Sequence, residues 1–281
     1  MTNFFISFII FAISYGYSFG VITSDIGKFC VMNAGSFIDE HCRSHNMDSN
    51  TLYSMSFIQY PADIKSHQIF IQKSFDTHII SSSLNVLNYG ILEEKDGNMF
   101  SAADQKLELS LFNIKSESFI YGVSAGYVTS QIDNYSSSLL TYNIGFKKHL
   151  INKRLAFGFS IEDYNYVIED FSNIQESYLS LKKVITEFQP RFLKAHIMFD
   201  YIYKNSNHYE YILGIKKYIN NFFNIYFGKH FYSSDTDNIN IFNNVSTGFS
   251  LLINNNYKIN FGIQHLADRM VNIGTSLSII K

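Results

Sequence analysis

The sequence predicts an all-β fold: a transmembrane antiparallel β-barrel of about fourteen strands with a short N-terminal hatch or plug segment. Three observations carry this prediction. Apolar and polar residues alternate through most strand-length segments, and these segments are longer than ordinary globular strands. Connections between them fall into a short and a long class, which is typical of barrels in the bacterial outer membrane.

The alternation is clearest in the last forty or so residues, which form strand, turn, strand, turn and strand. Because successive side chains of a strand point to opposite faces, each strand presents an apolar face and a polar face. On one strand, the apolar face carries Tyr257, Ile259, Phe261 and Ile263, and the polar face carries Lys258, Asn260, Gly262 and Gln264. The recurrent small inward residues, Gly and Ser, let a closed sheet curve and leave space in the lumen.

Strand-length segments continue through the chain from residue 52. Two of them, 66–75 and 176–188, alternate poorly, so their register is not predicted. The expected segments are 52–60, 66–75, 77–89, 99–113, 118–131, 134–148, 153–167, 176–188, 191–204, 208–219, 221–233, 241–254, 256–266 and 270–280.

The connections divide by length and charge. Short ones cover 74–76, 220–221 and 254–256, and longer, more charged ones cover 91–97, 169–176 and 233–240. Counted from a periplasmic N-terminus, the long connections fall on the outer side, as in outer-membrane barrels. Tyrosines near strand ends suit interfacial aromatic girdles, although some of them are expected to be core residues instead: Tyr53, Tyr89, Tyr166, Tyr203 and Tyr232.

Composition agrees with a barrel and bounds the function. The 281 residues include 27 Phe and 20 Tyr but only 2 Pro, which favours strands. The net charge of −2 gives no reason to expect nucleic acid. Residues 1–20 resemble a secretory signal peptide, residues 21–51 are expected to form the hatch or plug segment, and residues 52–281 the barrel.

Two cysteines, Cys30 and Cys42, follow the expected signal peptide. In an exported protein this pair is a candidate disulfide, although two free thiols are the alternative. A zinc site formed with His41 and His45 is disfavoured by the spacing. We therefore expect no metal and no cofactor.

No constellation predicts catalysis. His196 and Asp200 share one strand face, but nothing places a nucleophile such as Ser180 beside them. The Gly-x-Ser-x-Gly pattern beginning at Gly122 lies within a strand rather than at a strand-to-helix turn. An acidic group near residues 93–104 is expected to be a solvated outer loop rather than a calcium site.

Two sets of charged residues are candidates for other functions. Outer-loop acids could dock a partner: Glu93, Glu94, Asp96, Asp235 and Asp237. Lumen-facing charges are expected to pair with one another across the barrel interior: Lys147, Glu162, Asp200, Lys216 and Lys258.

Three stretches, at residues 88–104, 121–146 and 262–279, resemble the PorV/PorQ family of outer-membrane barrels in the same order along the chain. The first reads Asn-Tyr-Gly-Ile-Leu-Glu-Glu-Lys-Asp-Gly-Asn-Met-Phe-Ser-Ala-Ala-Asp and is closest to PorQ of the type IX secretion system. The family's Asn-Pro-Ala hatch ending is absent, and the chain ends in Lys281 rather than an aromatic residue.

The resemblance implies a non-enzymatic component of a type IX-like protein secretion and surface-attachment system in the bacterial outer membrane. Its partners would be outer-membrane lipid and either other proteins of that system or secreted cargo. The alternative is a FadL-like outer-membrane transporter for hydrophobic small molecules, since such barrels share fourteen strands and a hatch. A purely structural barrel is a third possibility.

Overall fold

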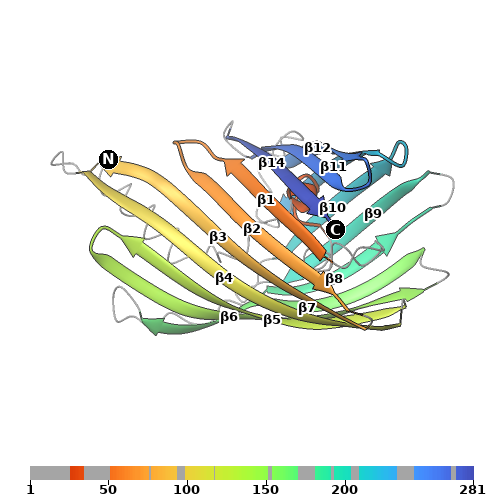
Figure 1. The fold of residues 1–281 in the computed structure, drawn as a ribbon, viewed down its shortest axis with the longest axis horizontal. Coiled ribbons are helices and arrows are strands. Elements are labelled where there is room, and N and C mark those ends of the chain that lie inside the picture. The colour runs from red at the N-terminus through yellow and green to blue at the C-terminus, as the bar shows by residue number, and fades with distance from the viewer. Residues whose placement is uncertain are drawn as a thin grey trace.

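Fourteen strands close into a single barrel in which every neighbouring pair is antiparallel, which confirms the predicted fold (Figure 1). The computed structural model describes residues 26–34, 51–75, 77–93, 99–116, 118–150, 154–169, 181–190, 193–203, 209–232, 244–266 and 270–281. The strands are β1 (Thr51–Gln59), β2 (Lys65–Ser74), β3 (His78–Glu93), β4 (Met99–Ser116), β5 (Phe119–Ile132), β6 (Tyr135–Leu150), β7 (Leu155–Glu169), β8 (Leu181–Phe188), β9 (Ala195–Tyr203), β10 (Tyr209–Tyr218), β11 (Phe223–Tyr232), β12 (Val245–Ile253), β13 (Tyr257–His265) and β14 (Val271–Ile280).

The first and last strands join to close the sheet. Leu52 of β1 lies opposite Ile280 of β14, and the main chains of Thr51 and Lys281 exchange hydrogen bonds of 3.1 and 2.9 Å. Closure satisfies the backbone groups that an open sheet edge would expose, which a membrane-spanning sheet requires.

The two classes of connection lie at opposite ends of the barrel. Because sequential strands are antiparallel, the short connections at residues 75–77, 219–222 and 254–256 share one end with the C-terminus. The long connections at 170–180 and 233–244 lie at the other end. The connections predicted as short and as long therefore join opposite ends of the strands, although the two-residue connection at 133–134 lies at the same end as the long ones. Most residues of the long connections fall outside the described part of the chain.

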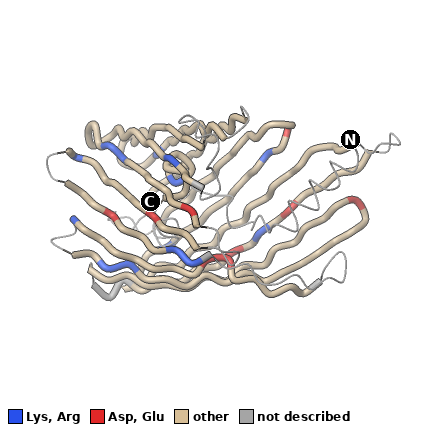
Figure 2. Tube along the Cα trace, turned by 180° about the vertical axis from the view of Figure 1, so that it is seen from behind, with Lys and Arg blue, Asp and Glu red and all other residues tan. Residues whose placement is uncertain are grey.

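The outward face of the strands is apolar. On β4 and β6, Leu109 and Ile144 leave 58% and 55% of their surface exposed while their strand neighbours are buried in the interior. Large apolar side chains exposed on strand after strand are costly in water but suit contact with lipid. In the view of Figure 2, charged positions are few along the strands.

Aromatic rings also gather on the outer face. Tyr201 and Tyr209 stack with ring centroids 5.6 Å apart, and Tyr203 lies 5.5 Å from Tyr209. Tyr53 and Tyr166 are exposed, as a membrane-interface position requires. The side chain of Tyr232 is outside the described residues.

A β-bulge interrupts the pairing of β3 with β4 between Asn88 and Ile91. Gly90 has a φ of 76°, and its N–H donates to Asn88 Oδ1 at 2.7 Å. The extra residue turns the chain locally. As a result the Tyr89 side chain lies beside the buried carboxylate of Asp104, so this candidate for the interfacial girdle belongs with the tyrosines expected in the core.

A second irregularity occurs where β6 pairs with β7, between Tyr142 and Ile144. Asp163, with a φ of 54°, is the inserted residue on β7. Before it, the inward residues have even numbers, such as Ser160; Asp163 itself points inward. The bulge thus places a carboxylate in the lumen that simple alternation assigns to the membrane face.

The two segments with poor alternation are regular strands in the structure. Phe70 on β2 points inward with Ser66, Gln68 and Gln72, which explains why the apolar pattern looked broken. On β8, Lys183, Ile185 and Glu187 point inward. Both inner faces mix apolar with polar residues, so hydrophobicity alone could not give their register.

Candidate functional site: the plugged lumen

A short N-terminal segment lies inside the barrel. It consists of α2 (Ile26–Phe29) and the turn that follows to residue 34, and we call residues 26–34 the plug. Figure 1 shows α2 inside the barrel, where it contacts β12, β13 and β14. No helix among the described residues is long and apolar enough to cross a membrane. Residues 1–25, 35–50 and hence the expected signal peptide lie outside the described residues.

The plug rests on a row of inward-facing glycines, one on each strand from β10 to β14. A Cβ built at any of them would approach a plug atom closer than 3.0 Å or at that limit, so any larger residue would displace the plug. At Gly262 the nearest atom is Cys30 Sγ, and at Gly274 it is Ile26 Cδ1 at 2.8 Å. We call this set the glycine row: Gly214, Gly228, Gly248, Gly262 and Gly274.

The register of the strands places these glycines side by side. Gly214 lies opposite Gly228, while Gly262 lies opposite both Gly248 and Gly274. Only between β11 and β12 is the row offset, because Gly228 faces Ser246. The glycines therefore form one continuous strip of bare backbone against which the plug packs.

Apolar packing holds the plug from its other sides. Ile26 and Phe29 are at most 1% exposed and join a cluster with Ile58, Met198 and Ile212 of the wall. Full burial of such side chains stabilises each by roughly 1.5–3 kcal/mol. Tyr60, in the β1–β2 connection, packs against the same cluster, and burial raises the pKa of its phenol to about 12.

Barrel side chains also satisfy the plug's backbone carbonyls. Gln264 Nε2 donates to Phe29 O and Ser246 Oγ donates to Cys30 O, both at 2.8 Å. Lys183 Nζ donates to Asn33 O at 2.9 Å. The last carbonyls of a helix have no partner within it. Phe29 ends α2, and its carbonyl accepts from Gln264 and from the Met32 N–H at 3.3 Å, while the other two bonds satisfy carbonyls of the turn that follows.

The turn after α2 requires unusual backbone angles. Met32 and Asn33 have φ values of 54° and 66°, in the left-handed region. Asn tolerates this region, whereas Met does so at a cost. Main-chain hydrogen bonds within the plug fix the turn, and the shortest run from Asn33 N to Lys28 O and from Cys30 N to Ile26 O, both at 2.9 Å.

Paired charges cover another arc of the inner wall, on β4 to β9. Lys147 Nζ and His196 Nε2 both contact Glu187 Oε2, at 2.7 and 2.9 Å, and Lys183 Nζ lies 2.9 Å from Asp200 Oδ2. A buried carboxylate is tolerated only when it is paired and hydrogen-bonded. We call the following residues the ionic wall: Lys106, Glu108, Lys147, Asp163, Lys183, Glu187 and Asp200.

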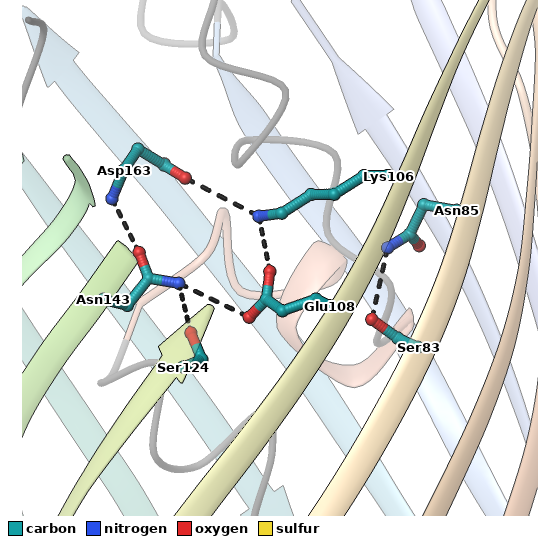
Figure 3. A network of polar contacts seen from close by, with 7 residues as sticks. All are labelled: Ser83, Asn85, Lys106, Glu108, Ser124, Asn143 and Asp163. Carbon is teal, nitrogen blue, oxygen red and sulfur yellow. Dashed lines mark hydrogen bonds and ion pairs between the residues drawn. The ribbon is translucent and has the colours of Figure 1, made fainter. Parts of the chain in front are cut away.

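Figure 3 shows the part of this wall on β4 to β7. Lys106 Nζ lies 2.5 Å from Glu108 Oε2 and 3.7 Å from Asp163 Oδ1. Asn143 connects the group, donating to Ser124 Oγ at 2.6 Å and accepting from the Asp163 N–H at 2.6 Å. The network ties the β7 bulge to the neighbouring strands.

The predicted lumen charges face the interior. The sequence predicts that they pair with one another, but the contacts described below are with residues outside that set. Lys147 and Asp200 contact Glu187 and Lys183 of β8, which the sequence analysis did not identify because β8 alternates poorly. Glu162 accepts a hydrogen bond from Ser160 at 2.6 Å.

The other two predicted lumen charges lie nearer the C-terminal end of the barrel. Lys216 lies over the rings of Tyr218 and Tyr226, at 5.0 and 5.8 Å. Lys258 is partly buried beside the β12–β13 turn.

Most of the predicted docking residues cannot be placed. Glu93 ends β3, but its side chain is outside the described residues. Glu94, Asp96, Asp235 and Asp237 lie outside them entirely, as does Cys42. Cys30 Sγ lies 3.4 Å from Phe261 O within the plug contact. The disulfide and the docking function therefore stay predictions. No group of metal-binding side chains occurs within the described ranges.

Comparison with known proteins identifies the fold. The structure resembles the toluene transporter TbuX of Ralstonia pickettii, with a TM-score of 0.61 and 9% identity over 84% of this chain and 90% of that one. It resembles the TodX monoaromatic hydrocarbon channel (a ΔS2S3 mutant), with a TM-score of 0.60 and 10% identity over 86% and 92%. A FadL homologue of Pseudomonas aeruginosa gives 0.56 and 9% over 91% and 97%.

These structures are FadL-like outer-membrane barrels, and their names describe a transporter and a channel rather than an enzyme. Identities of this size show a shared fold alone. By sequence, no family model matches the chain, and no curated protein matches it either. The PorV/PorQ resemblance and its secretion function gain no support from these comparisons.

Proposed function

We propose that this chain is an outer-membrane channel for hydrophobic small molecules, with the plug as the element that closes its lumen. The observation that carries the proposal is the plug itself, seated on the glycine row inside a closed fourteen-strand barrel. The likeness in fold to proteins named as a toluene transporter and a monoaromatic hydrocarbon channel supports the substrate class.

Two features of the wall favour a channel over a purely structural barrel. The β3–β4 ladder is interrupted at Tyr89 and Gly90, a strand irregularity suited to the wall of a solute pathway. The plug is also not a strand of the barrel: apolar packing and side-chain donors such as Ser246 and Gln264 hold it against the wall. A segment of this kind can open locally while the sheet stays closed.

Uptake of radiolabelled toluene tests the proposal. The full chain would be expressed in the outer membrane of a host that lacks a hydrocarbon channel. We expect several-fold faster uptake than in cells with an empty vector. Equal uptake in the two strains would contradict the channel function.

A locked variant tests the plug within the same experiment. A Cβ at Gly262 would lie so close to Cys30 Sγ that the plug must shift slightly to admit a side chain. In Gly262→Cys, in a Cys42→Ser background, that shift should bring the two thiols to bonding distance, and the disulfide with Cys30 would tether the plug that an unreactive side chain releases. Oxidised cells should show uptake close to the empty-vector level, and reduction should restore it. Uptake that is unchanged by oxidation, with the crosslink verified by mass spectrometry, would retain the channel but reject the plug as its closure.

The secretion function implied by the PorV/PorQ resemblance predicts a different result. Tagged protein purified from outer membranes would bring secretion or surface-attachment proteins with it, identified by mass spectrometry. Recovery of the barrel alone, with bound lipid or hydrophobic solute, favours the channel.

A further inference from the structure

A row of uncharged polar side chains crosses seven neighbouring strands on the inner wall. The members face one another in register from β11 through β14 and β1 to β3. We call this row the amide–hydroxyl belt: Asn224, Ser250, Asn260, Ser276, Ser56, Gln68 and Asn85. On β13 the belt residue Asn260 lies two residues before Gly262 and on the same inward face. The belt therefore adjoins the glycine row, on the side nearer the C-terminus.

Most of the belt residues are hydrogen-bonded to one another, but these bonds do not use all of their polar atoms. Asn260 Nδ2 donates to Ser276 Oγ at 2.8 Å, and Ser56 Oγ donates to Gln68 Oε1 at 3.3 Å. Asn224 Nδ2 donates to Ser250 Oγ at 3.2 Å. These pairings use one end of each amide and leave the other end to be satisfied.

Several of those remaining amide ends have no partner within the described residues. Gln68 Nε2, a donor, and Asn260 Oδ1, an acceptor, are both buried without a hydrogen bond, and these side chains belong to residues only 4% and 2% exposed. Asn85 Oδ1, opposite Gln68, is a second such acceptor. A buried polar group without a partner costs about 1–3 kcal/mol, so three in one row call for an occupant.

The donor and acceptor roles of these three atoms indicate which kind of ligand can bind them. A cation would satisfy the oxygens of Asn260 and Asn85 but not the Gln68 amide, and an anion would do the reverse. A hydroxyl both donates and accepts, so it satisfies either. The belt carries no charge that would favour an ion.

The distance between Gln68 and Asn260 sets the length of the ligand. Gln68 and Asn260 are separated by three strand spacings, or about 14 Å along the wall. We propose that the belt binds a neutral polyhydroxylated solute the length of a short oligosaccharide, a second ligand class distinct from the hydrophobic solutes of the proposed function.

Equilibrium dialysis of radiolabelled raffinose, a neutral trisaccharide, against the detergent-purified full chain tests this inference. Citrate serves as a charged probe. We expect saturable raffinose binding and no saturable citrate binding. In a Gln68→Leu/Asn260→Leu variant, raffinose affinity should fall roughly tenfold or more, because hydrogen bonds at both ends of the belt are lost.

Gln72→Leu is the matched control, since Gln72 lies on the inner face of the same strand but outside the belt. Its raffinose affinity should equal that of the wild type. If the double variant does not fold, as judged by heat-dependent gel mobility, Gln68→Met removes the donor at similar volume without adding a charge and should weaken binding alone.

Three results would overturn the proposal: no saturable binding of raffinose, which would leave ordered water as the occupant; equal affinity in the belt variants and the Gln72→Leu control; or citrate binding as well as raffinose. Toluene uptake is measured separately, so failure of this proposal and failure of the channel function remain distinguishable.

Discussion

The glycine row and the ionic wall occupy different arcs of one inner surface, and they contact the plug in different ways. Along the glycine row the wall has no side chains, so the plug touches the backbone and buries Ile26 and Phe29 there. Along the ionic wall, long side chains contact one another, and Lys183 is the member seen to reach the plug, through Asn33 O.

The difference shows how one barrel can hold a segment firmly in place without fixing it on every side. Close packing against bare backbone sets the plug's position, because apolar contact weakens steeply when a gap opens. The paired charges add rigidity to the wall itself. Substitutions in the two arcs should therefore have different consequences: on the ionic wall they should destabilise the barrel, and on the glycine row they should release the plug.

The largest effect is expected when one partner of a buried ion pair is removed. Asp200→Leu leaves the Lys183 ammonium without its carboxylate and should lower the free energy of unfolding by about 3–5 kcal/mol. The measurement is urea unfolding of the barrel in detergent micelles. The double variant Lys183→Met/Asp200→Leu should recover most of the loss, and a double variant as unstable as the single one would contradict the pairing.

A side chain on the glycine row should displace the plug and leave the barrel folded. Gly262→Val places two methyl groups in the space of Cys30 and Phe29, so about 3 kcal/mol of plug packing should be lost. Limited proteolysis should then cut within residues 26–34 while gel mobility still reports a closed barrel.

Gly126→Ala is the control for that substitution, because its Cβ would meet Thr141 and Lys106 instead of the plug. It should leave the proteolysis pattern of the plug as in the wild type. Protection of residues 26–34 in Gly262→Val equal to that in the wild type would show that the glycine row does not hold the plug.

Removing one anchor of the plug should have a smaller effect. Gln264→Leu removes the side-chain hydrogen bond to Phe29 O, leaves that carbonyl only the longer bond from the Met32 N–H at 3.3 Å, and should cost about 1 kcal/mol. Hydrogen exchange measured by mass spectrometry should show faster exchange in residues 26–34, by several-fold, and little change in β13. Uniform loss of protection across the barrel would instead indicate a global role for Gln264.

The smallest effects come from a matched pair of serines, one in each arc. Ser246→Ala removes the bond to Cys30 O, and Ser124→Ala removes one bond to Asn143, which still contacts Glu108. Each should cost about 0.5–1 kcal/mol. Exchange of the plug amides should rise only in Ser246→Ala, and an equal rise in both variants would erase the distinction between the arcs.

Much of the barrel could be predicted because its two faces meet different solvents. On β13 and β14 the apolar residues meet lipid and the polar ones the interior, so the period-two pattern is clean and the strands were placed correctly. Where the interior is itself apolar, as at Phe70, the pattern is lost although the strand is regular. Bulges defeat it differently: an extra residue at Asp163 reverses the faces without changing composition.

The site was harder to predict because it depends on register between strands that are distant in sequence. The sequence predicts that small residues recur on the inward face of the strands. Only the pairing of the strands shows that Gly214 and Gly274 belong to one row. A usable signal did exist: each of the last five strands carries a glycine in the inward phase. The partners of Lys147 and Asp200 were missed for the same reason, since both lie on β8, whose register the pattern did not define.

The position of the plug also has a consequence for how the protein is made. Its anchors are remote in sequence: Ser246 and Gln264 bind carbonyls 216 and 235 residues earlier in the chain. Contacts of such long range form late, since the intervening chain must be ordered first. The glycine row itself does not exist until the last five strands have paired. The plug is thus synthesised before every strand of the barrel and is among the last segments to reach its native place, so its docking reports that the barrel is complete.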